Sequence, residues 1–391
     1  MTIMLFVDIV WLIFFIFISG VFVIEYSKKH GLNLSISISI YIIHFIMTVF
    51  YWQFSIINNI DSVVYYNMAL TEKNILNTLG IGTKFIVSIT LPLVQYLGFN
   101  YFNCFAFFSF CGLIGFFKLY KLLDILDRDN KIRLFKIRII YIILLLPQFH
   151  FWTCALGKDS LSFLATILII ESVLKNNKFV YSVQFILSVA LLFLVRPYLF
   201  IFLILAFVIS RIIYGKTHVL YKILFSFLII GLFLFFKESL LSYFNIEDFS
   251  QKSVDSTINF YSEYSQDRSG SFIDPASTNF FMLVFSYLYR PFFYDAKGAL
   301  QLFSSIENLF LLVIFIKFFS LNFIKYIFKD SILLFLMTYF FINLIIKSLT
   351  LYNLGLASRQ KYIIIPVFFI AFYYFKEMYN RRQLFLESID R

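Results

Sequence analysis

The sequence predicts an all-α, polytopic integral membrane protein, and three observations carry this prediction. Hydrophobic residues make up 61% of the 391 residues and charged residues only 14%, against about 25% charged in ordinary soluble domains. Phe (56) and Tyr (26) are over-used. Apolar runs of about 15 to 24 residues recur along the chain, which is the length of a membrane-spanning helix. A soluble enzyme, a nucleic-acid-binding domain, a disulfide scaffold and an outer-membrane barrel are excluded.

The placement of Lys and Arg orients these runs, because cytoplasmic loops carry the excess of basic residues. Assigning the basic loops to the cytoplasm puts 21 of the 33 Lys and Arg residues on that side. The net charge of +11 then reflects the excess of basic residues in the cytoplasmic loops. We expect about eleven spans (range 10 to 13), with the N-terminus outside and the C-terminus in the cytoplasm. The expected spans are 3–24, 34–57, 99–117, 139–155, 157–174, 180–196, 198–213, 222–237, 301–317, 331–349 and 361–376.

One transmembrane domain is expected over residues 1–391. Its loops are an outer loop at 58–98, a large outer loop at 238–300, a basic cytoplasmic loop at 118–138 and a cytoplasmic tail at 376–391. Two apolar segments, 83–97 and 279–290, do not fit as spans because each would invert the basic loops that follow. We expect both to be helices that lie in the outer interface or dip part-way into the membrane, and that form walls of a site.

Charged residues at the outer ends of spans are informative, because the positive-inside rule does not account for them. Asp61 follows the second expected span, with Tyr65 and Tyr66 at helical spacing. An acid in this place suits a general base or a metal ligand. The alternative is a helix N-cap, for which Asp is favoured.

The segment HFWTCALGKDSLSF places Trp152, Lys158 and Asp159 in a turn between two expected spans. The amides of a helix N-terminus together with Lys158 suit a phosphate. The alternative is an interfacial Lys beside a capping Asp. Arg196 lies in the next outer turn and matches a diphosphate in geometry, with a snorkelling Arg as its alternative.

Two later outer segments repeat this pattern. Arg290, Asp295 and Gln301 occur close together among aromatic residues, and the alternative to a functional site is a salt-bridged interfacial turn. Arg359 and Gln360 lie in the last outer loop, where the alternative is a basic interfacial cluster. On the outer face these cations and aromatic rings together suit a lipid-linked diphosphate sugar, because rings stack on sugars and cations neutralise the leaving diphosphate.

The order of these motifs resembles a known family. The order is an early outer Asp, FW-x4-GKD-S, VRP, G-S-x-x-D-P, RPF-x2-D-A and SRQ. The pieces in this chain are Asp61, Phe151, Trp152, Gly157, Lys158, Asp159, Arg196, Pro197, Gly270, Ser271, Asp274, Arg290, Pro291, Phe292, Asp295, Ala296, Arg359 and Gln360. The chain is similar to Wzy-type O-antigen or capsule polymerases, within the wider GT-C class of integral-membrane glycosyltransferases. The large late outer loop of that group is also present.

The resemblance implies a bacterial inner-membrane enzyme of surface-polysaccharide synthesis that joins polyprenyl-diphosphate-linked oligosaccharide units on the outer face. It implies Asp61 as the catalytic residue, and the residues themselves offer Asp295 as a second candidate base. For diphosphate binding it implies Arg196, Arg290 and Arg359. From the residues themselves we add Lys158 to that role and expect sugar contact or support from Tyr65, Tyr66, Trp152, Asp159, Gln301 and Gln360. Other partners would be the lipid bilayer and the chain-length regulator and flippase of the same pathway.

No cofactor, metal or nucleic acid is expected. Gly-rich phosphate loops and zinc spacings are absent from the sequence, and no Asp-x-Asp pair accompanies Asp61. Two other functions stay open, a GT-C transferase that adds one sugar from a lipid-linked donor, and a flippase for lipid-linked sugars. A flippase typically shows repeated halves and midplane charges, whereas these cations lie at one edge and no internal repeat is evident.

Overall fold

The apolar runs fold as helices, since a bilayer offers no water to satisfy an exposed backbone. The computed structural model describes residues 2–58, 60–128, 132–175, 179–215, 218–224, 226–227, 231, 234, 272–274, 278–296, 298–351 and 353–389. The chain divides into two compact units, residues 1–200 and 201–391. Both are built from apolar helices, so the protein is an all-α membrane protein, as predicted.

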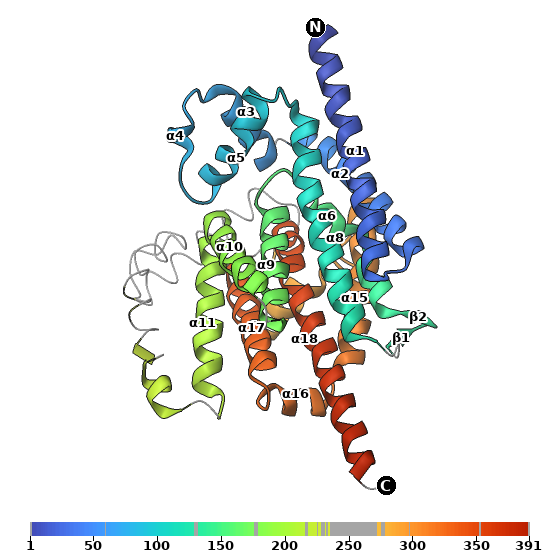
Figure 1. Ribbon diagram of the computed structural model, residues 1–391, viewed down its shortest axis with the longest axis vertical. Coiled ribbons are helices and arrows are strands. Elements are labelled where there is room, and N and C mark those ends of the chain that lie inside the picture. The colour runs from blue at the N-terminus through green and yellow to red at the C-terminus, as the bar shows by residue number, and fades with distance from the viewer. Residues whose placement is uncertain are drawn as a thin grey trace. The chain divides into compact units, whose positions relative to one another are not determined.

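Three long helices frame unit 1: α1 (Thr2–His30), α2 (Leu34–Asn58) and α6 (Tyr101–Leu126). They pack on one another in pairs (Figure 1). At one end, the Asn33 amide donates to the Tyr120 hydroxyl at 3.2 Å, so the turn between α1 and α2 lies beside the last part of α6. At the other end, the Trp11 indole donates to the Leu97 carbonyl at 2.9 Å.

The expected outer loop 58–98 is largely helical, with α3 (Asp61–Thr71), α4 (Ile75–Thr78) and α5 (Thr83–Gln95). Helix α5 confirms that the apolar segment 83–97 is a helix too short for a separate span. Its buried residues Ile86, Val87 and Leu91 join the core of unit 1, and α3 packs against it. The loop is therefore a folded cap and not a free connection.

The expected cytoplasmic loop 118–138 differs from the prediction in two ways. Helix α6 continues to Leu126, and a small hairpin follows, with β1 (Arg133–Leu134) antiparallel to β2 (Ile137–Arg138). Phe135 and Lys136 make its two-residue turn at φ 50° and 68°, as tight hairpin turns require.

The single helix expected over 139–155 is wrong. The segment forms α7 (Ile139–Leu144) and α8 (Pro147–Thr153), and α8 lies at 106° to α9 (Lys158–Leu174). Pro147 explains the break, because proline lacks an amide hydrogen and disfavours helical geometry in the preceding residue. Helices α10 (Phe179–Val195) and α11 (Pro197–Ile213) follow within a residue of the expected 180–196 and 198–213.

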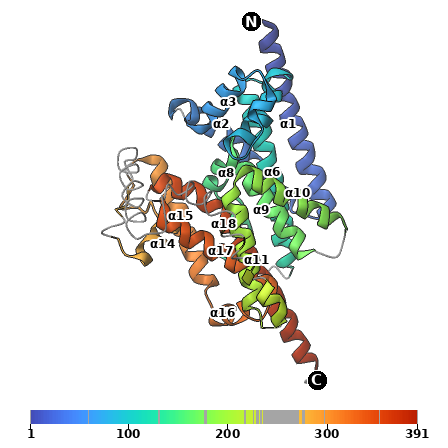
Figure 2. The same cartoon turned by 90° about the vertical axis from the view of Figure 1, so that its left-hand side faces the viewer.

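Unit 2 is a group of apolar helices (Figure 2), and stacked aromatic rings join some of them. Besides most of α11, its described helices are α14 (Phe280–Tyr289), α15 (Ala299–Phe318), α16 (Leu321–Ile327), α17 (Ser331–Thr350) and α18 (Leu354–Ile389). Helix α17 packs on α14 and α18. The rings of Phe318 and Phe372 stack at 3.7 Å and join α15 to α18. Helix α14 matches the expected segment 279–290.

The described residues contain six helices long and apolar enough to cross a membrane, or seven if the bent α8 and α9 pair is one span. The predicted eleven spans are not confirmed. Helices α10 and α11 have 17 residues each, at the short limit for a span. The expected span 222–237 and outer loop 238–300 fall mostly outside the described residues, as does the Gly270 and Ser271 motif.

Candidate functional site

The cap formed by residues 58–98 closes over the start of α9 in unit 1. The Ser62 hydroxyl donates to the Leu156 carbonyl at 2.7 Å. The Gly82 amide donates to the Leu194 carbonyl at 2.7 Å, at the end of α10. These two bonds bring four segments together at one end of the unit, and four of the predicted site residues lie among them: Tyr65, Lys158, Asp159 and Arg196.

Lys158 is the central cation of this cluster. It is the first residue of α9, and its ammonium group donates to the Thr83 hydroxyl at 3.1 Å. The same nitrogen lies 6.0 Å from the ring centre of Tyr65, whose side chain is buried. The residue before the helix is Gly157, which has no side chain to cap the first amides. The positive end of the helix dipole therefore adds to the charge of Lys158.

Gly157 is the residue that allows this close approach. Its φ is +154°, a conformation that other residues rarely adopt, and an added Cβ would lie 3.4 Å from the Tyr65 ring. In the sequence Gly157-Lys158-Asp159, the backbone conformation therefore requires the glycine, and two charged residues follow it. A ring, an ammonium group and helix amides meet there, a combination suited to a sugar phosphate.

Asp159 and Arg196 form a buried ion pair beside Lys158. The guanidinium Nη2 donates to Asp159, and Nη1 donates to the Tyr198 hydroxyl at 2.8 Å. The two charged residues are 2% and 5% exposed. This pair ties the start of α9 to the connection between α10 and α11. The charge of Arg196 is thereby balanced by Asp159, so a direct diphosphate contact of Arg196 stays a prediction.

The other predicted residues of unit 1 divide between surface and core. Asp61 is exposed and is the first residue of α3, directly before Ser62. It occupies the first turn, where an acid favours the helix dipole, while Ile60 holds the N-cap position. Tyr66 packs on the Tyr101 ring at 5.1 Å, and burial raises the pKa of Tyr66 to about 12.

Trp152 lies in the apolar part of unit 1. Its ring packs 4.9 Å from Phe151 and 5.7 Å from Tyr51, in a core of partly and fully buried aromatic side chains. These apolar surroundings fit a supporting role for Trp152 better than direct contact with a sugar.

Unit 2 holds a second cluster, around Arg290. The guanidinium group donates to both oxygens of Asp295, at 2.8 Å from Nε and 2.5 Å from Nη2. Burial opposes ionisation of Asp295, but the hydrogen bonds from Arg290 and from the Phe292 amide outweigh it and lower its pKa. The alternative proposed from the sequence, a salt-bridged turn, describes this geometry. To act as a general base, Asp295 would first have to break its hydrogen bonds with Arg290.

A buried polar network lies behind this turn. Lys361 is fully buried and donates to the Leu288 carbonyl at 3.2 Å and to the Asn308 side chain. The Asn308 amide in turn donates to the Pro291 carbonyl at 2.8 Å. The next residue along α18, Tyr362, donates to Glu307 at 2.9 Å. The turn after α14 is thus fixed to α15 and α18.

Arg359 and Gln360 are half-buried and stand directly before Lys361. They were expected in a loop, but α18 begins at Leu354, so both lie in its second turn. Gln301 lies in the first turn of α15, and its carbonyl accepts from Ser305 at 2.8 Å. Lys158 and Arg196 belong to unit 1, whereas Arg290 and Arg359 belong to unit 2.

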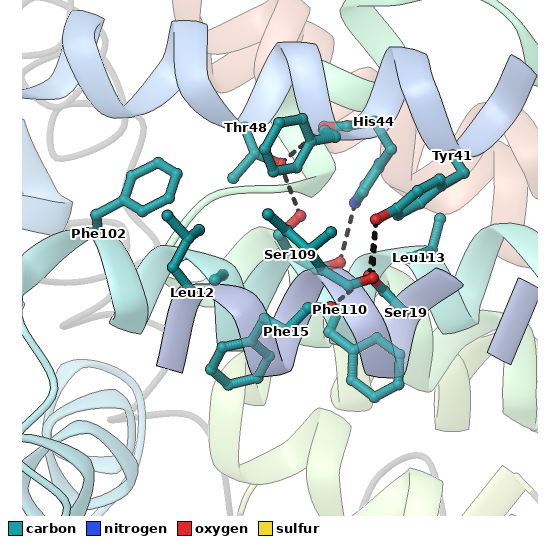
Figure 3. A pocket seen from close by; sticks show the side chains of 13 residues that line it. Leu12, Phe15, Ser19, Tyr41, His44, Thr48, Phe102, Ser109, Phe110 and Leu113 are labelled. Atoms are coloured by element: carbon teal, nitrogen blue, oxygen red, sulfur yellow. Dashed lines mark hydrogen bonds between the residues drawn. The ribbon is translucent and has the colours of Figure 1, made fainter. Parts of the chain in front are cut away.

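Some polar groups of unit 1 were not predicted from the sequence. His44 and His150 are buried, and their Nδ1 atoms lie 3.0 Å apart. His44 also lines a cavity of about 30 Å³ between α1, α2 and α6, where Thr48 and Ser109 meet at 2.7 Å (Figure 3). That volume holds about one or two water molecules. It is too small for a glycan.

A larger cavity lies at the opposite end of unit 1, beside the hairpin. It measures about 540 Å³ and is lined by Gly31, Asn33, Asp124, Ile125, Asp127, Arg128, Arg138 and Tyr141. Arg138 pairs with Asp124 at 2.8 Å and Asp127 at 3.3 Å. With Arg128, the lining holds two basic and two acidic residues, so its formal charges cancel. The cavity lies away from the cap and is not part of the Lys158 cluster.

Comparison with known proteins gives no family assignment. No family model, curated protein or solved structure matches the chain. Within the described ranges, no group of three His, Cys, Asp or Glu side chains could hold a metal ion. The function is therefore argued from the chain's own contacts, of which those around Lys158 are the most suggestive of a ligand.

Proposed function

We propose that the protein is an integral-membrane glycosyltransferase that polymerises polyprenyl-diphosphate-linked oligosaccharide units. One observation carries the proposal: Lys158 sits at the uncapped start of α9, against Tyr65 and Thr83, under a folded cap that also bears Asp61. A cation, helix amides and an aromatic ring in one place suit the diphosphate and the first sugar of such a substrate.

The chemistry assigned to this site is a displacement at an anomeric carbon. A hydroxyl of the acceptor unit forms the new glycosidic bond while the bond from that carbon to the diphosphate oxygen breaks. Asp61 takes the hydroxyl proton, as a general base does. Lys158 and the first amides of α9 stabilise the negative charge that develops on the leaving diphosphate.

We assign the remaining charged residues positioning or binding roles according to the contacts that each makes. Arg196 and Asp159 act as positioning residues that hold the start of α9. In unit 2, Arg290 is held by Asp295, and Arg359 precedes the buried Lys361. We retain Arg290 and Arg359 as further candidate diphosphate ligands, and Asp295 as the partner that orients Arg290.

The proposed setting is the outer face of a bacterial inner membrane. In unit 1 the Lys158 cluster lies at the end opposite to the basic turn 28–33 and the end of α6, where the positive-inside rule places the cytoplasm. The proposed partners are the lipid-linked glycan, the bilayer, and a flippase and a chain-length regulator of the same pathway.

The test combines a deletion strain with point variants. Without the gene, cells should carry single repeat units on the carrier or acceptor lipid, and the wild-type gene should restore the polymer ladder on gels. Lys158→Gln and Asp61→Asn should lower polymer formation by about 10²-fold or more at normal protein levels. The matched controls Lys73→Gln and Glu25→Gln remove exposed charges and should restore the ladder.

Intact long-chain polysaccharide in the deletion strain would overturn the proposal. Loss of one sugar residue from every unit, with chain length unchanged, would instead identify a single-addition GT-C transferase. Retention of lipid-linked units on the cytoplasmic side would identify a flippase.

A further inference from the structure

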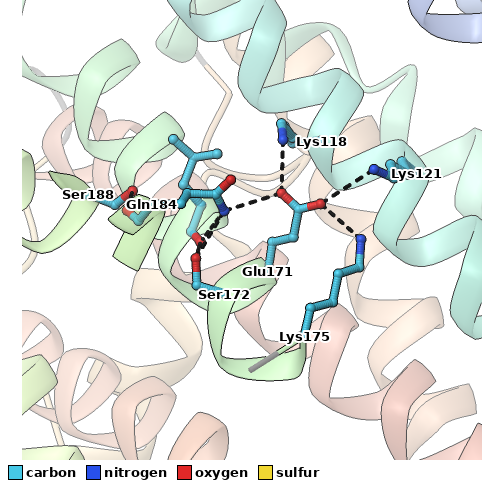
Figure 4. A network of polar contacts seen from close by, with 8 residues as sticks. Lys118, Lys121, Glu171, Ser172, Lys175, Gln184 and Ser188 are labelled. Atoms are coloured by element: carbon cyan, nitrogen blue, oxygen red, sulfur yellow. Dashed lines mark hydrogen bonds and ion pairs between the residues drawn. The ribbon is translucent and has the colours of Figure 1, made fainter. Parts of the chain in front are cut away.

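At the end of unit 1 opposite to the Lys158 cluster, more lysines surround a buried carboxylate than its single negative charge can neutralise. Glu171 lies in the last turn of α9, and its side chain is 1% exposed. Lys118 and Lys175 each approach it at 3.0 Å and Lys121 at 3.6 Å (Figure 4). Lys118 and Lys121 come from α6, and Lys175 follows the last residue of α9. We call these three lysines the lysine cluster.

The carboxylate of Glu171 is fully engaged by this arrangement. One oxygen accepts from Lys118 and, at 3.4 Å, from Gln184, and the other pairs with Lys121 and Lys175. Gln184 also donates to the Ser172 hydroxyl at 3.0 Å. One buried acid thus joins α6, α9 and α10, but a single ammonium group would already neutralise it.

The excess charge amounts to between one and two units. Three ammonium groups face one carboxylate, and the C-terminal end of the α9 dipole contributes roughly half a negative charge. Lys118 and Lys121 are 22% and 15% exposed at their side chains, so a ligand can reach them. Each has three N–H donors and a single ion pair with Glu171 among the described residues, which leaves donors for an anion.

The lysine cluster lies at the depth of lipid headgroups. Helix α6 has 26 residues, which makes it about 39 Å long, roughly 9 Å more than the hydrocarbon core of a bilayer. No charged residue precedes Lys118 in α6. The excess length therefore falls at the end with Lys118 and Lys121, and these turns extend into the interface. Lys121 also lies 5.9 Å from the ring of Tyr26, which packs on His30 at 4.4 Å. Aromatic rings of this kind mark the interface.

We propose that the lysine cluster binds the phosphodiester headgroup of an anionic phospholipid, with Lys118 and Lys121 as its ligands and Glu171 as the residue that positions them. A phosphodiester carries one negative charge, which matches the excess, and its two free oxygens accept from two ammonium groups. Basic pockets between membrane helices bind anionic headgroups in this way. This site is separate from the Lys158 cluster and does not depend on the proposed function.

The test measures lipid retained by the purified full-length protein in native mass spectrometry. Wild type should keep phosphatidylglycerol in preference to phosphatidylcholine, and the double variant Lys118→Gln/Lys121→Gln should weaken that preference about 25-fold, or about fivefold for each lysine. The control variant Lys325→Gln/Lys329→Gln removes the same charge from exposed lysines and should retain the wild-type preference.

A second variant keeps the test valid if the double variant is poorly folded. Glu171→Gln keeps the three lysines and a similar side-chain shape but removes the competing carboxylate, so phosphatidylglycerol retention should rise. Equal retention of both lipids by wild type would overturn the proposal. Displacement of the lipid by an equal concentration of inorganic phosphate would assign the cluster to a soluble phosphate and overturn the lipid assignment.

Discussion

Arg196 and Asp159 illustrate how a buried charge depends on its partner. Both are almost fully buried and bond directly, so Arg196→Met alone should destabilise unit 1 by about 3–5 kcal/mol, since Asp159 is left charged and unbalanced. The double variant Asp159→Leu/Arg196→Met should recover much of that loss. Melting temperatures of the detergent-solubilised proteins measure both effects. Equal loss in the single and double variants would contradict the pairing.

Asp295 predicts a pH dependence of stability in unit 2. Its pKa lies below the ordinary 3.8 because the hydrogen bonds from Arg290 and the Phe292 amide outweigh burial. A carboxyl with a lowered pKa stabilises the fold above its ordinary pKa, and that contribution is lost as the pH falls through the lowered value.

The difference in melting temperature between wild type and Asp295→Asn should therefore be largest near pH 7 and should shrink below pH 3.8. Glu25→Gln is the control, because Glu25 and Lys28 are 68% and 65% exposed and such surface pairs contribute little. A difference that does not change with pH would show that Asp295 acts by packing alone.

At the scale of the element, a glycine decides how closely α6 and α8 approach. A Cβ added at Gly112 would lie 2.1 Å from the carbonyl oxygen of Thr153, which is backbone and cannot rotate away. Gly112→Ala should destabilise unit 1 by about 1–3 kcal/mol through overpacking. Gly20→Ala in α1 is the control, since nothing lies within 4 Å of its added Cβ, and it should leave the melting temperature unchanged or higher. Equal effects would contradict the close contact.

Helix bounds could be predicted from the sequence wherever hydropathy alone determines them. The expected 34–57 and 331–349 become Leu34–Asn58 and Ser331–Thr350. The expected 139–155 failed because Pro147 divides a continuous apolar run, and hydropathy does not register the missing amide hydrogen. The hairpin at Phe135 was missed because its turn holds neither Gly nor Asn.

The candidate site could be predicted only as a set of residue types. The motif around Lys158 was recognisable, but its contacts with Thr83 and Tyr65 join positions far apart in the chain. Such pairs depend on how the cap folds, which a single sequence does not reveal. In the same way, the sequence marked Arg196 as a cation, and only the tertiary structure identifies Asp159 as its partner.

At the scale of the whole molecule, each unit separates its basic and its polar ends. In unit 1, Lys118 and Lys121 share an end with the turn at Asn33, opposite to Lys158. In unit 2, the rings of Tyr326 and Tyr379 lie 5.6 Å apart, so the basic segment 317–330 lies beside the last turns of α18. Both basic ends should therefore face the cytoplasm.

Variants that each add one cysteine to the chain test this sidedness in each unit independently. Tyr96→Cys and Tyr294→Cys should react with a membrane-impermeant thiol reagent in intact cells. Both native side chains are largely exposed and lie near the polar ends of their units. Phe135→Cys and Leu321→Cys lie at the basic ends and should react only after lysis, because positive charge resists translocation. The wild-type chain is the control for the three native cysteines, of which Cys104 and Cys154 are buried and Cys111 is half-buried. Reaction of Phe135→Cys in intact cells would place the basic end of unit 1 outside and remove the basis for an outer-face site at Lys158. Reaction of Leu321→Cys would do the same for Arg290 and Arg359 in unit 2.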